Sequence, residues 1–155
     1  AAPRPPCRFE QVTWRGEGGE VQCVLDVGHN PDALALLFHK VAAAYPGRRP
    51  RVVLGLSTGK DLRACLAAAL QFAGAPDRLH LVQAAHRRGV PVEALRAAVA
   101  PVQITGESGS VKETISTLLE KLVHPDEDVV VICGSTFLMS DARDALGLSY
   151  PSDAM

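Results

Sequence analysis

Apolar runs bounded by glycine, proline and polar residues alternate along this chain with segments whose apolar residues recur every three or four positions. Short apolar runs are typical of buried strands, and the longer periodic segments are typical of helices that pack on one face. The runs predict strands at residues 8–14, 21–27, 51–57, 79–82, 102–105 and 129–133. The periodic segments predict helices at residues 31–45, 62–73, 91–99, 111–122 and 137–146.

The order of these elements determines the expected fold. A strand followed by a helix occurs five times, and this alternation is typical of parallel strands joined by right-handed crossovers. Residues 8–14 and the glycine-rich turn at 16–19 precede the first such unit and predict a hairpin. We therefore predict a three-layer α/β domain with a mostly parallel, Rossmann-like sheet of about five strands plus an N-terminal edge strand.

The stretch from Val21 to Asp32 organises this expected domain. Its apolar half has apolar residues on both faces, as a parallel strand covered by helices does. Asn30 followed by Pro31 predicts a helix start, because asparagine accepts a bond from a free helix N–H and proline fits the first helical position. Asp26 and His29 are therefore expected at the carboxyl end of a strand, where open α/β sheets bind ligands.

Three other strand ends carry polar or glycine-rich turns, at residues 57–61, 83–88 and 134–136. Since parallel strands end at one edge of the sheet, these turns are expected to meet the Asp26–Asn30 turn. Together they would supply a carboxylate, an imidazole, a lysine and an arginine. Such a set suits an anionic ligand, with phosphates and carboxylates as the obvious candidates.

Each of these side chains also has a purely structural interpretation. Asp26 could cap a turn, and His29 could bond to the backbone beside it. Lys60 and Arg88 could be ordinary surface charges, while Ser135 could cap the last helix. His39, His80 and His124 are interpreted as structural or exposed, and Ser110 to Glu113 predicts a capping box.

Composition excludes several classes of function. Lys and Arg number 16 against 17 Asp and Glu, so no basic field exists to attract nucleic acid. No apolar run approaches the ~20 residues that span a bilayer. The cysteines are scattered without zinc-ligand spacing and are expected to be buried in a reducing compartment; they are Cys7, Cys23, Cys65 and Cys133.

Several nucleotide and hydrolase motifs are absent. The sequence has neither GxxxxGK[ST] nor a GxGxxG after the first strand, so it cannot cradle a triphosphate in the usual way. The segment around Ser135 lacks the second glycine of a nucleophile elbow. Residues 1–7 are proline-rich without the apolar core of a signal peptide, and we expect them to be a linker from a preceding domain.

A set of motifs then points to one family: Cys7-Arg-Phe-Glu10, Leu25-Asp-Val-Gly-His-Asn-Pro31, Gly55-Leu-Ser-Thr-Gly-Lys-Asp61 and Val131-Ile-Cys-Gly-Ser-Thr-Phe137, followed by Ala142-Arg143. In this order they resemble the C-terminal domain of folylpolyglutamate synthase and dihydrofolate synthase, members of the Mur ligase superfamily. The resemblance covers nearly the whole chain. It implies a linker at 1–7, a Mur ligase C-terminal domain at 8–148 and a tail at 149–155.

The resemblance implies an ATP-dependent ligase. In that family a carboxylate of folate or dihydropteroate takes the terminal phosphoryl group of ATP, and the amine of L-glutamate attacks the acyl phosphate. The central domain holds the P-loop and the ligands of magnesium (Mg2+), so no metal ligand is expected here. The chain is expected to close over ATP beside its own P-loop domain, and to be inactive alone. The expected compartment is the cytoplasm, with mitochondrion and plastid as alternatives.

Residue roles follow from the same resemblance. Arg8, Asp26, His29 and Asn30 would bind the nucleotide, with Asp26 accepting from the ribose hydroxyls and His29 donating to the transferring phosphoryl group. The carboxylates of glutamate would be held by Lys60, Ser135 and Arg88.

Two positions depart from the family pattern, and two other functions remain open. Cys7 stands where the family usually has glycine, and Gly59 stands in place of an aspartate before Lys60. One alternative is a non-catalytic α/β binding or interaction module, against which the intact Arg8, Asp26 and His29 count. The other is a different Mur-type amino-acid ligase, although the histidine in Asp-x-x-His-Asn-Pro favours folate.

Overall fold

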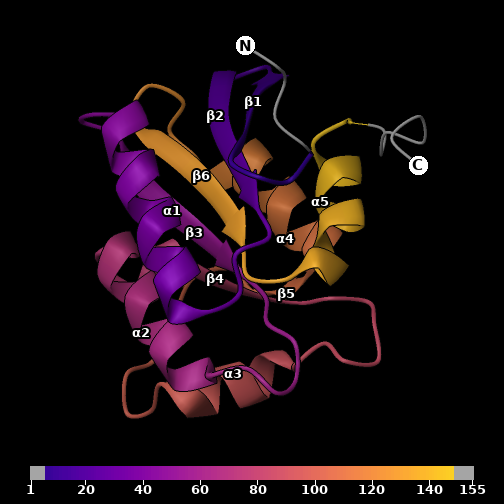
Figure 1. The fold of residues 1–155 in the computed structure, drawn as a ribbon. Helices are drawn as coiled ribbons and strands as arrows, with labels where there is room; N and C mark the ends of the chain where they lie inside the picture. Colours follow the sequence, from indigo (N-terminus) through magenta and orange to yellow (C-terminus); the bar gives the residue numbers. More distant parts are fainter. Residues whose placement is uncertain (1–5, 149–155) are drawn as a thin grey trace.

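The computed structural model describes residues 6–148, which form a six-stranded sheet in the order β1-β2-β6-β3-β4-β5 (Figure 1). The strands are β1 Glu10–Gly16, β2 Gly19–Asp26, β3 Arg49–Leu54, β4 Leu79–Gln83, β5 Gly109–Ser110 and β6 Asp128–Cys133. β1 and β2 are antiparallel, and every other neighbouring pair is parallel. The predicted mostly parallel sheet with an N-terminal edge strand is confirmed. The expected tail at 149–155 and most of the expected linker lie outside the described residues.

Helices cover both faces of the sheet (Figure 1). The α-helices are α1 Pro31–Ala44, α2 Leu62–Ala73, α3 Val92–Ala98, α4 Val111–Thr117 and α5 Met139–Ala145. Short turns of other helix types are η1 Pro76–Arg78, η2 Leu118–Leu122 and η3 Thr136–Leu138. α1, α2 and α3 pack on one face, and α4 and α5 pack on the other. No described helix is long and apolar enough to cross a membrane.

Alternation within the strands divides the core into two layers. Val52 and Val131 are buried with α1 and α2, whereas their neighbours Val53 and Ile132 are buried with α4 and α5. Because both faces of β3 and β6 are covered, these strands are apolar at successive positions rather than at every second one. The apolar runs in the sequence therefore mark the middle of the sheet.

Two local predictions are wrong. Residues 102–105 form no strand: Val102 is 42% exposed, and the Thr105 amide donates to the Pro76 carbonyl. The chain after this segment pairs with β4 only at β5, where residues 109–110 lie beside residues 82–83. At Leu81 the backbone amide donates to the Ser108 hydroxyl instead of to a neighbouring strand. The capping box at Ser110 is also absent, since its side chain makes no capping bond, although α4 begins at the next residue.

A buried cluster of charged side chains lies at the end of the sheet opposite the edge where a ligand is predicted to bind. Asp128 at the start of β6 accepts from Arg78 at 2.7 Å and from Arg51 at 3.4 Å. Burial alone would raise the pKa of Asp128, but the amide of His124 and the Arg78 guanidinium more than offset it and hold the pKa below its usual value. His80 is fully buried beside Arg51, which confirms its structural interpretation.

The cysteines are buried and unpaired, as predicted. Burial raises the pKa of Cys23 to about 12, so this residue behaves as a small apolar side chain rather than a nucleophile.

Candidate functional site

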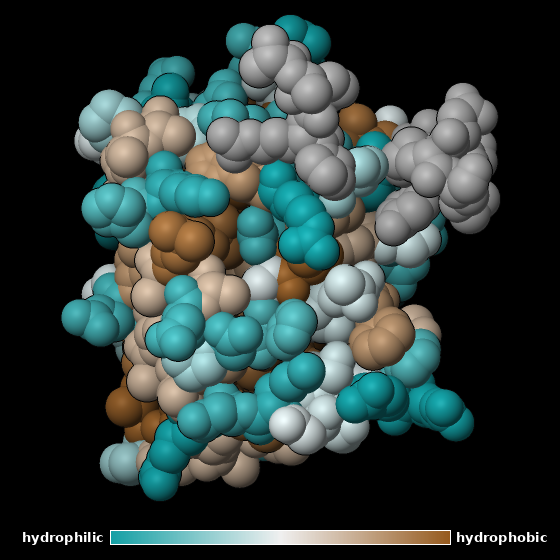
Figure 2. Space-filling view, viewed as in Figure 1, coloured by the Kyte–Doolittle hydropathy of each residue, from teal (hydrophilic) through white to brown (hydrophobic). Residues whose placement is uncertain are grey.

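Two adjoining cavities lie at the carboxyl ends of the parallel strands. The first, about 200 Å³ and here named the cationic cavity, is lined by His29, Ser57, Lys60, Arg88, Ser135, Thr136 and Phe137. The second, about 260 Å³ and here named the α1 cavity, is lined by Arg8, Asp26, Val27, Gly28, His29, Ala33, Leu36, Leu37, Lys40 and Thr136. His29 and Thr136 belong to both cavities. In Figure 2, hydrophilic and intermediate residues cover the middle of the face where the strands end in Figure 1.

Two glycines allow the ends of β3 and β6 to come close together beside the cationic cavity. Gly134 follows β6 with a φ of 111°, and a Cβ there would lie 2.1 Å from the carbonyl oxygen of Gly55. Only glycine allows the ends of β3 and β6 to approach so closely. This approach brings the hydroxyls of Ser57 and Ser135 within 3.0 Å of each other, and both side chains are buried.

Ser135 has a structural role and lines the cavity at the same time. Its Oγ accepts from the amide of Phe137 at 3.1 Å and thereby caps η3. The structural alternative for Ser135 is therefore correct. A serine hydroxyl has two acceptor sites and one donor, so capping and a contact with a ligand are compatible.

The turn after β4 is fastened to the turn after β3. The amide of Thr58 donates to the carbonyl of Arg88 at 2.8 Å, and the amide of Val90 donates to the carbonyl of Leu56 at 2.9 Å. These two bonds hold Arg88 and Lys60 at one cavity although they belong to different strand ends. Within residues 6–148, neither cation forms an ion pair. The cavity thus offers two positive charges to an anion.

His29 lies between the two cavities with a defined tautomer. Its Nδ1 is 3.1 Å from the carbonyl oxygen of Val27. A carbonyl only accepts, so Nδ1 carries the proton in this contact and Nε2 is left for a ligand. The structural alternative for His29, a bond to nearby backbone, is present and sets the tautomer.

Asp26 and Asn30 build the turn of the α1 cavity. The Asp26 carboxylate accepts from the amide of Gly28 at 2.7 Å and from the amide of Phe9 at 2.8 Å. Asn30 accepts from the amide of Ala33 at 2.8 Å, so it is the predicted cap of α1 and lines neither cavity.

The α1 cavity also has an apolar wall. Leu36, on the surface of α1, is 56% exposed there, and Arg8 and Lys40 supply positive charge. This mixture of exposed apolar surface and cations suits a ligand with a flat ring and an anionic group.

The segment that carries Arg8 passes beside the α1 cavity in an unusual backbone conformation. Cys7 and Phe9 have φ angles of 62° and 45°, a region that favours glycine. The crossing is held by the bond from the Val27 amide to the Cys7 carbonyl at 2.9 Å, and by Glu10, which accepts from the Cys7 amide and from Arg143. Burial, together with the charge of Glu10, raises the pKa of the Cys7 thiol.

The structure brings together every predicted site residue except Asn30. Lys60, Arg88 and Ser135 line the cationic cavity, Arg8 and Asp26 line the α1 cavity, and His29 lines both. Ser57 and Thr136 lie in turns that the sequence predicts at this edge of the sheet, without a role of their own, and Leu36, Lys40 and Phe137 were not predicted as site residues. An apolar residue on the polar side of a helix would have indicated Leu36. No sequence signal indicated Phe137, because its exposure depends on how η3 turns.

The match to a family model decides the classification. Residues 7–136 match the model described as Mur ligase, glutamate ligase domain. The chain belongs to this family. No protein in the comparison with curated sequences matched.

Solved structures show the same Mur ligase domain fold. The chain shares 24% identity and a TM-score of 0.73 with bifunctional folylpolyglutamate synthase/dihydrofolate synthase from Yersinia pestis complexed with AMPPNP and Mn ion, covering 94% of this chain and 32% of that one. Mycobacterium tuberculosis folylpolyglutamate synthase complexed with ADP and AMPPCP is 22% identical with a TM-score of 0.69, and the match covers 93% of this chain and 33% of that one. E. coli FolC in complex with DHPP and ADP is 24% identical with a TM-score of 0.67, and the match covers 92% of this chain and 31% of that one. The chain thus spans about a third of the length of these proteins.

The two departures from the family pattern have structural consequences in this Mur ligase domain. Gly59 has a φ of 85° with open space around it, so the position before Lys60 is left-handed and an aspartate there would be strained. Cys7 presents the reverse case, because a residue with a Cβ occupies a left-handed position, with a φ of 62°. Its buried thiol packs against the α4 and α5 side of the core.

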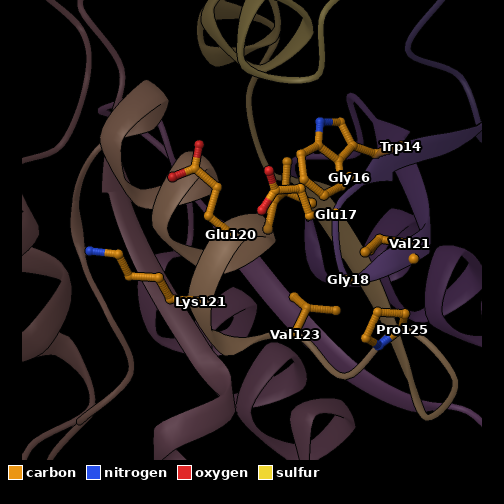
Figure 3. A pocket seen from close by; sticks show the side chains of 11 residues that line it. Trp14, Gly16, Glu17, Gly18, Val21, Glu120, Lys121, Val123 and Pro125 are labelled. Atoms are coloured by element: carbon orange, nitrogen blue, oxygen red, sulfur yellow. The ribbon is translucent and has the colours of Figure 1, made fainter.

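A third cavity, of about 510 Å³, lies at the opposite end of the sheet (Figure 3). Trp14, Val21 and Pro125 form its apolar walls, and Glu17 and Glu120 lie at its edge. Its charged residues are mostly acidic, unlike those of the cationic cavity. It lies away from the motifs that the family shares, so the cavities around His29 form the candidate site.

Proposed function

We propose that this chain is the C-terminal domain of an ATP-dependent ligase that adds L-glutamate to folate or dihydropteroate through an acyl phosphate. The observation that carries the proposal is the position of His29, which lines both the cationic cavity and the α1 cavity. A nucleotide in one cavity and an amino acid in the other would meet at this side chain. Membership in the glutamate ligase domain family supports the proposal.

The α1 cavity would take the nucleotide. Arg8 would contact the nucleotide near its base, and the exposed Leu36 would pack against the base. Each Asp26 oxygen accepts one backbone N–H and keeps a further lone pair, so the carboxylate could still accept from a ribose hydroxyl. Asn30 would contribute indirectly, by fixing the start of α1 beside His29.

The cationic cavity would take L-glutamate. Lys60 and Arg88 would pair with its two carboxylates, and the Ser135 hydroxyl would donate to one of them. Two carboxylates and two cations match in charge, and guanidinium binds carboxylate in a bidentate fashion. This arrangement would leave the amine of glutamate directed at the boundary where His29 lies.

The residues that the structure describes do not fit magnesium. Within the described residues, no group of three or more His, Cys, Asp or Glu side chains could hold a metal ion. Asp26 is the one carboxylate among the residues lining the α1 cavity, and both of its oxygens already accept backbone bonds. Magnesium prefers several oxygen ligands, so its protein ligands would come from outside this chain. The structures from Yersinia pestis and Mycobacterium tuberculosis carry ATP analogues, in the first case with Mn ion.

The proposed reaction has two steps, a phosphoryl transfer and the formation of an amide. A substrate carboxylate attacks the terminal phosphorus of ATP, which gives an acyl phosphate and ADP. The glutamate amine then attacks the acyl carbon, and the C–O bond to phosphate breaks as the amide forms and the amine loses its proton. As the imidazolium, with Nδ1–H on the Val27 carbonyl, His29 would donate from Nε2–H and stabilise charge on the transferring group, while Lys60 and Arg88 would hold the incoming amine in line.

Kinetics of the longer protein that contains this chain test the proposal. We expect ATP-dependent glutamate addition from that protein and none from the 155 residues alone, because the sequence lacks a P-loop. Lys60→Ala should raise KM for glutamate with little change in KM for ATP, and Arg8→Ala should do the reverse. A non-catalytic module would show no ligase activity in the longer protein. A different Mur-type ligase would turn over another amino acid in preference to glutamate.

A further inference from the structure

A stacked pair of rings borders the cationic cavity. The imidazole of His86 lies on the phenyl ring of Phe137, with centroids 3.8 Å apart and ring planes inclined by 5°. Phe137 lines the cavity and is 38% exposed. The stack joins the turn after β4 to the turn after β6, so two segments that meet at the cavity are also linked at its edge.

His86 acts on Arg88 as well. Its Nδ1 is 3.1 Å from the backbone nitrogen of Arg88, and that amide can only donate. In this contact Nδ1 therefore carries no proton, and the neutral ring has its hydrogen on Nε2. The His86 side chain thus accepts a hydrogen bond from the Arg88 backbone through Nδ1 and packs the face of its ring against Phe137.

The remaining bonds of this turn leave the Arg88 backbone little freedom. The Gly89 amide donates to the His86 carbonyl at 2.8 Å, and the Arg88 carbonyl accepts from Thr58 at 2.8 Å. The Arg88 side chain, in contrast, is exposed and forms no ion pair within the part of the chain that the structure describes. The Arg88 backbone, which His86 anchors, therefore fixes the place beside the cationic cavity from which this side chain extends.

We propose that His86 is a positioning residue that, stacked on Phe137, directs Arg88 toward the cationic cavity and so selects an amino acid with two carboxylates. Lys60 alone would hold one carboxylate of any amino acid. A second cation at a fixed place distinguishes a side-chain carboxylate from the neutral amide of the same shape. The proposal rests on the proposed function, because glutamate is the ligand assigned to this cavity.

Titration of the 15N-labelled chain by NMR tests the proposal, with L-glutamate and L-glutamine as ligands and the Lys60 and Arg88 amides as reporters. His86→Phe keeps a ring for stacking and removes the acceptor for Arg88. We expect it to weaken glutamate binding about three- to ten-fold, the effect of one hydrogen bond, and to reduce the preference over glutamine. His124→Phe is the matched control, an exposed histidine at the far end of the sheet, and should change neither.

A double variant separates positioning from general structure. If His86 acts through Arg88, His86→Phe has no further effect in an Arg88→Ala background, and an additional loss there would overturn the positioning role. Unchanged affinity and selectivity in His86→Phe would overturn this inference and leave the glutamate site intact. Absence of glutamate shifts in the wild type would overturn both. His86→Leu, which also lacks the acceptor, replaces His86→Phe if that variant does not fold.

Discussion

Arg143 on α5 donates from Nη1 to both carboxylate oxygens of Glu10 on β1, at distances of 2.5 Å and 2.7 Å. The same Glu10 carboxylate accepts from the amide of Cys7 at 2.9 Å. Arg8 is the residue after Cys7, so this ion pair helps to hold in place the segment from which Arg8 reaches the α1 cavity. Glu10 and Arg143 lie near the two ends of the described domain, 133 positions apart in the sequence.

Loss of the Arg143 guanidinium should destabilise the domain. Arg143→Met leaves the Glu10 carboxylate without its cation, and the Glu10 side chain is only 24% exposed. We expect the free energy of unfolding to fall by about 2 kcal/mol, less than for a fully buried pair because water still reaches Glu10. Urea denaturation followed by circular dichroism measures this.

A surface pair serves as the control for that variant. Arg15 and Glu20 form an ion pair whose side chains are 78% and 55% exposed. Arg15→Met should lower the free energy of unfolding by less than about 0.5 kcal/mol. Equal losses in the two variants would mean that the Glu10 pair has no special role.

Gly134 should tolerate no side chain. In Gly134→Ala the new methyl group would meet the Gly55 carbonyl, at a φ that L residues rarely adopt. We expect a loss of more than about 3 kcal/mol in the free energy of unfolding. Gly18→Ala is the control, because nothing lies within 4 Å of a Cβ there, and thermal denaturation compares the two. A mild effect of Gly134→Ala would show that the ends of β3 and β6 separate without cost.

Stability should fall in mild acid because of His80. Burial, with the charges of Arg51 and Arg78, lowers the pKa of His80 from 6.5 to about 4, although the Glu107 carbonyl and Asp77 act in the opposite direction. Between these two values the unfolded chain binds a proton that the folded chain does not. The free energy of unfolding should therefore decrease by about 3 kcal/mol as pH falls from 6.5 to 4.

The histidine contribution is isolated by substitution. His80→Asn removes the titrating group and retains a donor for the Glu107 carbonyl, which His80 contacts through Nδ1 at 2.9 Å. Denaturation midpoints of both proteins between pH 7 and pH 4 should converge as the pH falls. If the midpoints of the two proteins fall in parallel with pH, the acid sensitivity belongs to other groups, such as Asp128.

Arg8 is a better test of the nucleotide site than Asp26. Asp26→Ala would release the amides of Phe9 and Gly28 and so disturb the rim without any ligand. Arg8 is exposed, and Arg8→Ala should leave the melting temperature unchanged while weakening nucleotide binding at least several-fold, the effect of one lost charged contact. Nucleotide affinity equal to wild type in Arg8→Ala would exclude Arg8 from the α1 cavity's function.

Local patterns predicted much of the rim. Asn30 was recognised as a cap because its partner lies only three residues away. The convergence of Lys60, Arg88 and Ser135 also followed from the sequence, since parallel strands end at one edge of a sheet.

Other contacts depend on which strands are neighbours. The approach of Ser57 to Ser135 and the stack of His86 on Phe137 require β6 to lie between β2 and β3, and alternation along the chain does not specify that order. The predicted strand at 102–105 failed for a related reason, because its apolar residues do not show whether β4 has a free edge there.

Chemical-shift mapping of the 15N-labelled chain with L-glutamate and, separately, with ATP and magnesium tests the central claim that His29 joins two ligand sites. Glutamate should shift the amides of residues 57–60, 86–89 and 134–137, and ATP should shift those of residues 8–9, 26–29 and 36–40. The His29 amide should respond to both. The account is contradicted if either ligand shifts the residues around Trp14 instead, or if neither shifts His29.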